Sequence, residues 1–288
     1  MPEGSYRFQV GSLGCTVLSD GYVDYPSPWF FPNAQPSALA EALEKRRLPH
    51  DYILSPYTCL LIETGRRVLL VDTGAGPASS TTGAIVARLE VAGIRPRDVD
   101  AVVLTHAHPD HIGGAVTADM RPLYPNAAYY ISDREWEFWT GSHRDLTGMR
   151  LPEQMKGSMR DEARRCLEAL RHHLEPLEAE TEIVPGVYAI PAPGHTPGHL
   201  ALRLESGGEQ LLNLGDAAVH PLHLEHPEWE NGFDLAADQA AATRRTLLDL
   251  ASDPAAAGHT HVMAFHFPFP SVGRVQRRNG AWEWIPGW

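Results

Sequence analysis

The sequence of 288 residues predicts an α/β protein in which two β-sheets and flanking helices form layers. Strand pairs come first, helices then alternate with strands, and this order recurs in the C-terminal half, which is typical of a layered α/β architecture. Hydrophobic residues make up 43% of the chain, enough to bury a sizeable core. Because no repeat or linker divides the chain, we expect one domain over residues 1–288.

The predicted strands are short apolar runs bounded by polar or turn-forming residues. The first two are joined by a glycine-containing turn, and so are the next two. The expected strands are Tyr6–Val10, Cys15–Ser19, Tyr57–Glu63, Arg67–Asp72, Ala101–Thr105, His199–Leu204, Gln210–Leu214 and His261–His266.

Four segments carry a helical pattern. We expect Ser37 to be the N-cap of the first helix, and Ile85, Leu89 and Val91 to form the apolar face of the second. The expected helices are Ser37–Arg47, Thr81–Ala92, Glu153–His173 and Leu235–Leu250.

Two segments look like insertions into the layered core. Residues 25–56 are rich in aromatic residues and proline, and residues 118–180 are expected to be helical and include the aromatic segment Glu135–Trp139. Aromatic side chains near a site can form an apolar lid over a substrate. Ordinary core packing or a homodimer contact explains each of these residues equally well.

Charge and cysteine content exclude several classes of function. The formal net charge of −12 disfavours binding to nucleic acid or to anionic membranes. No apolar run is long enough to span a membrane, and the N-terminal residues lack the features of a secretory signal. The three cysteines, Cys15, Cys59 and Cys166, form no CxxC pair, which favours the reducing cytoplasm.

One motif gives the strongest indication of function in the chain. Residues 105–114 read THAHPDHIGG and follow a buried strand. His106 and His108 are two residues apart, so in extended backbone they project to the same side. Pro109 ends the strand, and Asp110 and His111 can face the same cavity from the turn. Adjacent ligands arranged in this way suit two neighbouring metal ions better than one.

This motif resembles the defining motif of the metallo-β-lactamase superfamily. Three further segments resemble that family and occur in its order: LLVDTG at 69–74, PGHTPGH at 193–199 and LGD at 214–216. The resemblance covers most of the chain, from about Tyr57 to His266. It implies an αββα sandwich with two mixed sheets and a metal centre at one edge of them.

The resemblance also implies a set of metal ligands. His106, His108 and His195 would hold the first ion; Asp110, His111 and a final histidine would hold the second, with Asp216 bridging the two. Five imidazoles and two carboxylates without a thiolate suit Zn²⁺ but also accept Mn²⁺, Fe²⁺ or Co²⁺.

The final histidine has three candidates, His259, His261 and His266. The strand that contains His261 must end before Pro268. His266 would therefore lie at its C-terminal edge, as His106 does after its own strand, and we favour His266 with His261 as the alternative.

Two further residues are candidates for supporting roles. The resemblance makes Asp72 a residue that orients a ligand imidazole, although it could instead cap the turn at Thr73. His199 is expected to open a strand and support the site.

A pair of divalent ions can share a hydroxide and polarise a carbonyl group, so the expected reaction is hydrolysis. The segment AFHFPFPSVGR at 264–274 resembles the branch that holds N-acyl-homoserine lactonases and methyl-parathion-hydrolase-like enzymes. It indicates a small ester-like substrate, with lactones first. A thioesterase similar to glyoxalase II and a phosphotriester or aryl ester hydrolase are the alternatives, and a non-enzymatic metal-binding protein is disfavoured because every ligand has a candidate.

The expected catalytic residues are Asp110, Asp216 and His220. Lactonases of that branch carry a tyrosine three residues after the bridging aspartate, where it assists the substrate carbonyl. This chain has Val219 at that position. His220 is therefore expected to serve as an auxiliary donor, with His223 as an alternative.

Overall fold

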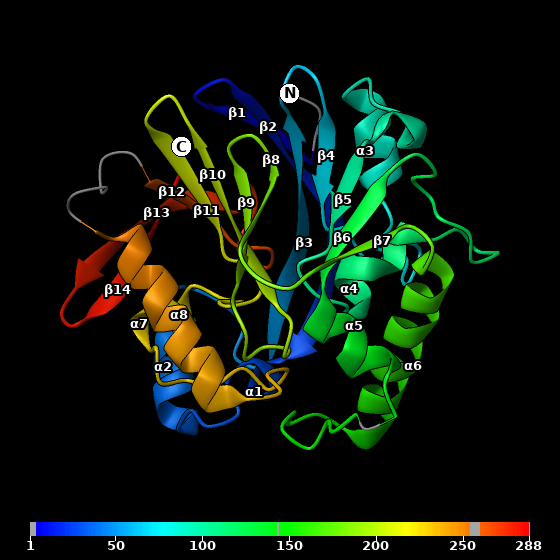
Figure 1. The fold of residues 1–288 in the computed structure, drawn as a ribbon. Helices are drawn as coiled ribbons and strands as arrows, with labels where there is room; N and C mark the ends of the chain where they lie inside the picture. Colours follow the sequence, from blue (N-terminus) through cyan, green and yellow to red (C-terminus); the bar gives the residue numbers. More distant parts are fainter. Residues whose placement is uncertain (1–3, 143, 254–259, 288) are drawn as a thin grey trace.

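We describe the fold from a computed structural model, in which residues 4–142, 144–253 and 260–287 are described. Two seven-stranded mixed sheets face each other, and helices cover their outer faces (Figure 1). The strands of each sheet lie side by side in chain order. The first sheet contains β1 (Ser5–Val10), β2 (Leu13–Pro26), β3 (Tyr52–Glu63), β4 (Val68–Val71), β5 (Ala101–Val103), β6 (Ala128–Ser132) and β7 (Leu174–Leu177).

The second sheet is antiparallel except where β11 and β12 run parallel. It contains β8 (Thr181–Val184), β9 (Val187–Pro191), β10 (Leu200–Ser206), β11 (Glu209–Asn213), β12 (Thr260–Met263), β13 (Val272–Arg278) and β14 (Ala281–Pro286). The αββα sandwich expected from the sequence is therefore confirmed.

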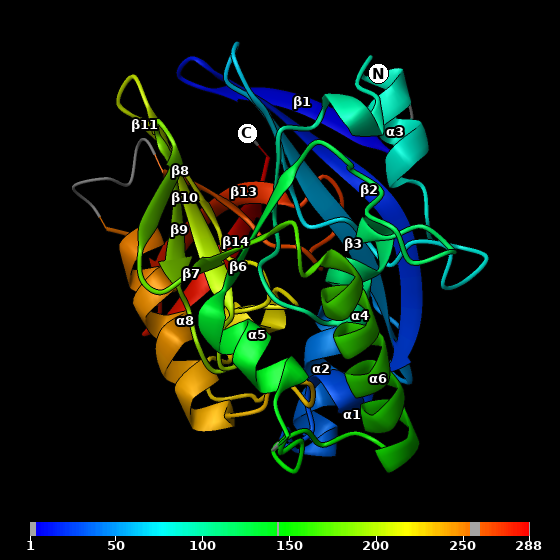
Figure 2. The ribbon, with the colours of Figure 1, turned by 45° about the vertical axis from the view of Figure 1, so that its right-hand side comes forward.

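The helices divide between the two outer faces. In the turned view, α3 to α6 lie on the side of the first sheet, and α8 lies against the second sheet, where it contacts β12 and β13 (Figure 2). None of the helices in the described part of the chain is both long and apolar enough to cross a membrane. The bounds are α1 (Ser27–Phe30), α2 (Pro36–Lys45), α3 (Ile85–Val91), α4 (Pro109–Ile112), α5 (Asp133–Thr140), α6 (Glu153–Leu170), α7 (Leu222–Glu225) and α8 (Ala237–Ala251).

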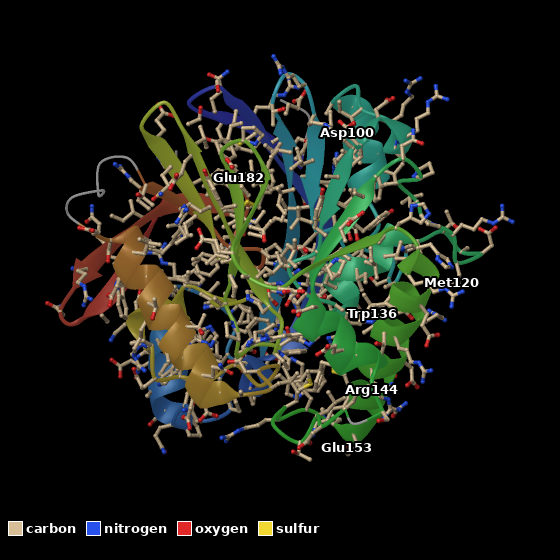
Figure 3. The ribbon with its side chains drawn as sticks, viewed as in Figure 1. Asp100, Met120, Trp136, Arg144, Glu153 and Glu182 are labelled. Atoms are coloured by element: carbon tan, nitrogen blue, oxygen red, sulfur yellow. The ribbon has the colours of Figure 1, made fainter. Side chains whose placement is uncertain are left out.

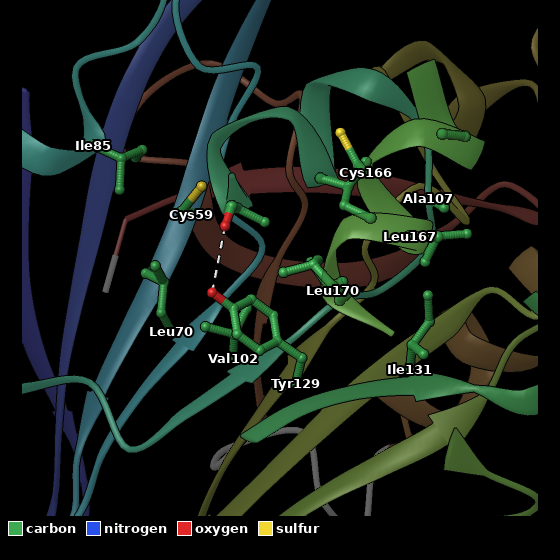
Figure 4. Close-up of a cluster of buried hydrophobic side chains, with 14 of the residues drawn as sticks. Cys59, Leu70, Ile85, Val102, Ala107, Tyr129, Ile131, Cys166, Leu167 and Leu170 are labelled. Atoms are coloured by element: carbon green, nitrogen blue, oxygen red, sulfur yellow. Dashed lines mark hydrogen bonds between the residues drawn. The ribbon is translucent and has the colours of Figure 1, made fainter. Parts of the chain in front are cut away.

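The β3 strand separates two hydrophobic cores. Because successive strand residues point to opposite faces, Leu60 and Ile62 enter the core between the sheets while Cys59 and Leu61 enter the core beneath the helices. Apolar residues on both faces explain why this strand reads as a continuous hydrophobic run rather than an alternating one. Figure 4 shows the core beneath the helices, where the α6 side chains of Cys166, Leu167 and Leu170 approach the first sheet.

The insertion predicted for residues 25–56 is shorter than expected. The β2 strand continues to Pro26 and β3 begins at Tyr52, so α1 and α2 fill only the segment between these strands. The sequence predicted this strand only over Cys15–Ser19. In the structure the strand passes through Asp20 and Gly21 with a register shift, and the buried carboxylate of Asp20 accepts hydrogen bonds from the backbone of Ala75, Gly83 and Ile85.

Other expected boundaries also change. The segment 118–180 contains β6 and β7 as well as helices, so part of it belongs to the first sheet. Pro36 is the first residue of α2 and Gln35 is its N-cap, so Ser37 is not a cap; proline is favoured at the first helical position because no helical partner exists there for an N–H. The last strand before Pro268 ends at Met263, which places His266 in the turn that follows.

Candidate metal centre

The centre is built around the segment that follows β5. The strand starts next to Asp100, which lies at the far end of the sandwich from Arg144 and Glu153, and runs toward the middle of the molecule (Figure 3). After Val103 the chain leaves the sheet, and Pro109 opens the short helix α4. The motif therefore follows a buried strand, as the sequence predicted, but Asp110 and His111 lie in α4 rather than in a turn.

The structure brings all seven residues expected to bind metal into two adjoining groups. In each group, one donor atom per residue lies within 4.8 Å of the others. The first group is His106, His108, His195 and Asp216, and the second is Asp110, His111 and His266.

Asp216 reaches both groups. Its Oδ2 lies 3.3 Å from His195 Nε2 in the first group and 3.2 Å from His266 Nε2 in the second. Its Oδ1 lies 3.4 Å from His111 Nε2. On the other side of the second group, Asp110 Oδ2 lies 3.4 Å from His266 Nε2. This placement of Asp216 fits the bridging role expected from the sequence.

Hydrogen bonds at Nδ1 orient several of the imidazoles toward the centre. His111 Nδ1 lies 2.9 Å from Asp72 Oδ2, and His195 Nδ1 lies 2.8 Å from Asp234 Oδ1. His266 Nδ1 lies 3.0 Å from the carbonyl oxygen of Pro56. An acceptor at Nδ1 holds the proton there and leaves the lone pair of Nε2 directed to the centre, which is the usual state of a metal-binding histidine.

His108 presents the other ring nitrogen. Its Nδ1 lies 3.0 Å from His195 Nε2, so these two nitrogens converge on the same point. Two lone pairs at this separation repel each other unless a proton or a cation lies between them. The arrangement therefore favours a shared cation in the first group.

Unpartnered buried atoms show that the residues fit metal ions. Among the described residues, His106 Nε2, His111 Nε2 and Asp216 Oδ1 are buried and have no hydrogen-bond partner. A buried polar atom without a partner costs free energy, on the order of 1–3 kcal/mol each. His111 Nε2 lies 3.4 Å from Asp216 Oδ1 and His106 Nε2 lies 3.9 Å from Asp216 Oδ2, so divalent cations at the centre would satisfy the unpartnered atoms.

The pKa values of the buried residues at the centre are shifted by burial and by their charged neighbours. Burial raises the pKa of Asp216, but His266 and His111 outweigh it and hold this pKa well below its usual range. Burial lowers the pKa of His195, yet Asp216 and Asp234 raise it to about 9. In contrast, burial and the neighbouring imidazoles keep the pKa of His106 well below its ordinary value. Asp216 therefore lies in surroundings that favour its ionised form, which is the form that would bind metal ions.

Asp72 has the orienting role that the sequence predicted. Besides its contact with His111, its Oδ1 accepts a hydrogen bond from the backbone N–H of Thr105 at 2.8 Å. Its φ of 58° lies in the left-handed region, which turns the chain sharply at the end of β4. His199 also supports the site, because its Nε2 accepts the backbone N–H of Asp216 at 2.9 Å.

Sequence reasoning missed two supporting carboxylates. Asp234 orients His195 but belongs to the segment before α8, far from any ligand in the chain. Glu135 is fully buried and lies in α5. No local pattern marks either residue, since each reaches the centre only through the tertiary fold.

Glu135 connects the two loops that carry the ligands of the first group. Its Oε1 accepts the N–H of Ala107, between the two histidines of the motif, at 2.9 Å. Its Oε2 accepts from Thr196 Oγ1 at 2.7 Å and from the backbone N–H of Gly198 at 3.0 Å, in the loop of His195. Burial raises the pKa of Glu135 while these hydrogen bonds lower it. The Glu135 side chain therefore holds the two ligand-bearing loops of the first group in a fixed relative position.

The structure separates the candidates for the last ligand. His266 belongs to the second group, as predicted, whereas His261 lies within β12 and outside both groups. His259 lies outside the described residues.

The structure differs from the sequence prediction at His220. Its Nδ1 accepts the backbone N–H of Leu222, and its ring lies edge-on to Phe31, with the ring centroids 5.5 Å apart. Burial and the nearby Arg46 lower its pKa to about 3, so it is not a protonated donor at neutral pH. His223 is likewise buried, with its Nε2 3.1 Å from the carbonyl oxygen of Phe30.

A pocket of about 340 Å³ opens onto the centre. Asp110, Asp216 and His266 lie in its wall together with Val219. Most of the remaining wall is apolar and is contributed by Val23, Tyr25, Phe30, Met155, Met159 and Phe233. An apolar pocket with a few converging polar groups is the usual form of a small-molecule site.

The fold and the centre define a class of protein, and comparison with known families identifies it. Residues 52–257 match the model of the metallo-beta-lactamase superfamily, so the chain belongs to this superfamily. It is a hydrolase whose centre is suited to two divalent metal ions.

Comparison with individual proteins shows which members of the superfamily this chain resembles. An N-acyl homoserine lactonase from Bacillus sp is 27% identical over 208 residues, which cover 65% of this chain and 73% of the relative. The solved structure of AidC, a dizinc quorum-quenching lactonase in complex with a product, superposes with a TM-score of 0.92 at 28% identity and covers 99% of this chain and 97% of AidC. The hydrolase AbOPH superposes with a TM-score of 0.87 at 25% identity, covering 99% of this chain and 98% of its own.

Proposed function

We propose that this protein is a dizinc lactonase that opens the ring of N-acyl-homoserine lactones. The observation that carries the proposal is the apolar pocket whose wall includes members of both metal-binding groups. The similarity to AidC extends over nearly the whole chain, so it includes the segments that line the pocket. A homodimer and a cytoplasmic location are part of the proposal and rest on the sequence.

The proposed ligands follow the two groups. His106, His108 and His195 would hold one zinc ion and the second group would hold the other, with Asp216 available to both. When bound, the ion pair supplies Lewis acidity and lowers the pKa of a water molecule toward neutrality. Nitrogen and oxygen ligands without thiolate suit zinc in a catalytic rather than a structural site.

Asp110 is suited to carry the proton of the reaction. Both Asp110 and Asp216 lie in the pocket wall, but the side chain of Asp110 is 19% exposed and that of Asp216 only 4%. Hydrolysis adds hydroxide to the carbonyl carbon, breaks the ring C–O bond and must deliver a proton to the departing oxygen. We propose that Asp110 receives the proton of the attacking water and passes it to that oxygen.

The pocket wall favours an uncharged substrate with an aliphatic chain. Phe30, Met155, Met159 and Phe233 offer apolar surface, and methionine adapts its shape to flexible chains. Among the described residues that line the pocket there is no lysine or arginine. A glutathione thioester carries carboxylates that would enter this pocket without a cationic partner, which argues against the thioesterase alternative.

The experiment compares substrates on one zinc-loaded preparation. We expect the largest kcat/KM for an N-acyl-homoserine lactone with a six-carbon acyl chain, compared with a glutathione thioester and an aryl phosphotriester. Each methylene added to a shorter acyl chain should raise kcat/KM about fourfold until the pocket is full, because burying a methylene contributes about 0.8 kcal/mol. Turnover of the thioester or the phosphotriester with no turnover of lactones would overturn the proposal.

A further inference from the structure

Two tyrosines on neighbouring strands meet inside the pocket. Tyr57 on β3 lies opposite Gly21 on β2, and Tyr25 lies four residues further along β2. Residues four apart in a strand share a face, so both rings project to the same side of the sheet. Their hydroxyl oxygens are 2.6 Å apart, and both side chains line the pocket.

The pair lies beside the metal-binding residues. The ring of Tyr57 packs edge-on to that of His266, with 5.4 Å between the ring centroids. Tyr25 is held by Phe30 and Phe233, whose ring centroids lie 5.9 Å and 5.5 Å from its own. Both hydroxyls are therefore fixed in a wall that also contains Asp110 and Asp216.

The other hydroxyl groups in the described pocket wall are engaged elsewhere. Ser55 Oγ lies 2.8 Å from His266 Nδ1, on the side of that ring away from Nε2. Thr82 Oγ1 donates to the carbonyl oxygen of Gly76 at 2.9 Å. Ser79 Oγ lies 2.9 Å from Thr81 Oγ1 in an exposed turn.

The tyrosine pair, in contrast, has one hydroxyl hydrogen that is not used in the hydrogen bond between the two rings. Two hydroxyls carry two hydrogens, and the bond between Tyr25 and Tyr57 uses one of them. Among the described residues, neither hydroxyl has a second hydrogen-bond partner. The remaining hydrogen is therefore available to an acceptor that enters the pocket.

We propose that the paired hydroxyls of Tyr25 and Tyr57 donate a hydrogen bond to the carbonyl oxygen of the substrate's lactone ring. This inference rests on the proposed function. Val219, at the edge of the same pocket, has no donor to offer, and His220 is turned away toward Leu222.

A hydrogen-bond donor at this point would add to the polarisation of the carbonyl group that the ion pair supplies. When hydroxide adds to the carbonyl carbon, the carbonyl oxygen gains a full negative charge, and it loses that charge when the ring C–O bond breaks. A donor that is already oriented stabilises this charge more than it stabilises the neutral substrate, so it raises kcat. The second tyrosine of the pair orients the donating one by accepting or donating the internal hydrogen bond.

The test uses Tyr25→Phe, Tyr57→Phe and the double variant in the zinc-loaded enzyme, with an N-hexanoyl-homoserine lactone as substrate. Each single variant should lower kcat about a hundredfold while KM changes by less than about threefold. The kcat of the double variant should be no more than about threefold below that of the less active single variant, because the two hydroxyls act as one unit. Tyr22→Phe is the matched control: Tyr22 lies on the same strand but is 43% exposed, so its removal should leave kcat unchanged.

A second measurement does not depend on turnover. The ring-opened product, N-hexanoyl-homoserine, has a carboxylate where the ring carbonyl was, and calorimetry should show that it binds the Tyr57→Phe variant about tenfold more weakly. Metal content and melting temperature are measured on the same samples to show that the fold and the centre are intact.

The outcomes separate the two proposals. If the zinc-loaded wild type does not hydrolyse lactones, the proposed function is wrong and this inference falls with it. If the wild type is active and the single variants retain kcat and product affinity within about twofold, the function stands and the tyrosine pair is only structural. Additive losses in the double variant would show two independent contacts and would contradict a single paired donor.

Discussion

The two metal-binding groups use similar donor atoms but differ in burial. His106, His108 and His195 in the first group are at most 2% exposed, whereas the second group contains Asp110, with a side chain that is 19% exposed, and His266, at 6%. The second group thus forms the solvent side of the centre.

The groups also differ in how the fold holds them. The first is fixed through Asp234 and through Glu135, which joins its two loops. The second combines two residues of the four-residue helix α4 with His266 from a turn, and Asp72 is its only carboxylate support among the described residues. We infer that the first group binds its ion more tightly and that the second ion exchanges more readily.

The largest effect is expected at the residue that both groups share. Asp216→Asn keeps the shape of the side chain but removes the charge that lies beside both groups. We expect kcat/KM for the lactone to fall by at least about a thousandfold, because the nucleophile and the electrophile both depend on the paired ions. Elemental analysis should show loss of metal, and activity near that of the wild type would mean that the bridging residue is misassigned.

Removal of the last histidine ligand should affect the second metal-binding group and leave the first intact. His266→Ala takes a ligand from the second group only, so we expect about one ion per chain and a loss of activity of about a hundredfold. His261→Ala is the matched control, because His261 lies outside both groups on the strand just before. Two ions in His266→Ala together with metal loss in His261→Ala would reverse the assignment.

The supporting aspartates should act on separate ions. Asp72→Asn loses the acceptor for His111 and Asp234→Asn disturbs the acceptor for His195, so each should weaken metal binding about tenfold to a hundredfold. Competition with a chelator should show weaker binding of the readily exchanged ion in Asp72→Asn and of the tightly held ion in Asp234→Asn. The same ion affected in both variants would contradict the comparison.

The smallest effect on metal content is expected from Glu135→Gln. Besides the three hydrogen bonds described above, the carboxylate accepts one from Trp139 Nε1 at 2.6 Å. The amide group cannot accept all four, so at least one buried N–H or hydroxyl loses its partner. We expect unfolding to become easier by about 1–3 kcal/mol, with two ions still bound at saturating zinc. Denaturant unfolding of the zinc-loaded protein measures the free energy of unfolding. An unchanged value would show that the Glu135 hydrogen bonds contribute nothing to stability.

The sequence predicted the centre better than its surroundings. His106, His108, Asp110 and His111 are contiguous in one motif, so their clustering follows from the local chain, and the remaining members follow from a family pattern. The supports Asp234 and Glu135 and the pair Tyr25–Tyr57 have no such pattern. They reach the pocket only because the strands and α5 pack there, which a single sequence does not reveal.

The same distinction applies to the fold. The buried strands before His106, Asp216 and His266 were predicted to within a few residues, because their apolar runs are continuous, whereas β9, before His195, was not predicted. The β2 strand was predicted too short, because the apolar run ends at Asp20. The tertiary contacts of the Asp20 carboxylate make this polar residue compatible with the buried strand. His220 was predicted as a donor because it follows Val219 in the chain, but its Nδ1 accepts from Leu222 and the residue does not line the described pocket.

The most direct test of two unequal metal-binding groups is a stepwise removal of metal. The zinc-loaded protein is dialysed against increasing chelator, and the ions per chain and the lactone turnover are measured on each sample. We predict two ions per chain at the start, a plateau near one ion, and loss of most activity before that plateau is reached. An active enzyme that never holds more than one ion, or a single transition from two ions to none, would contradict the account.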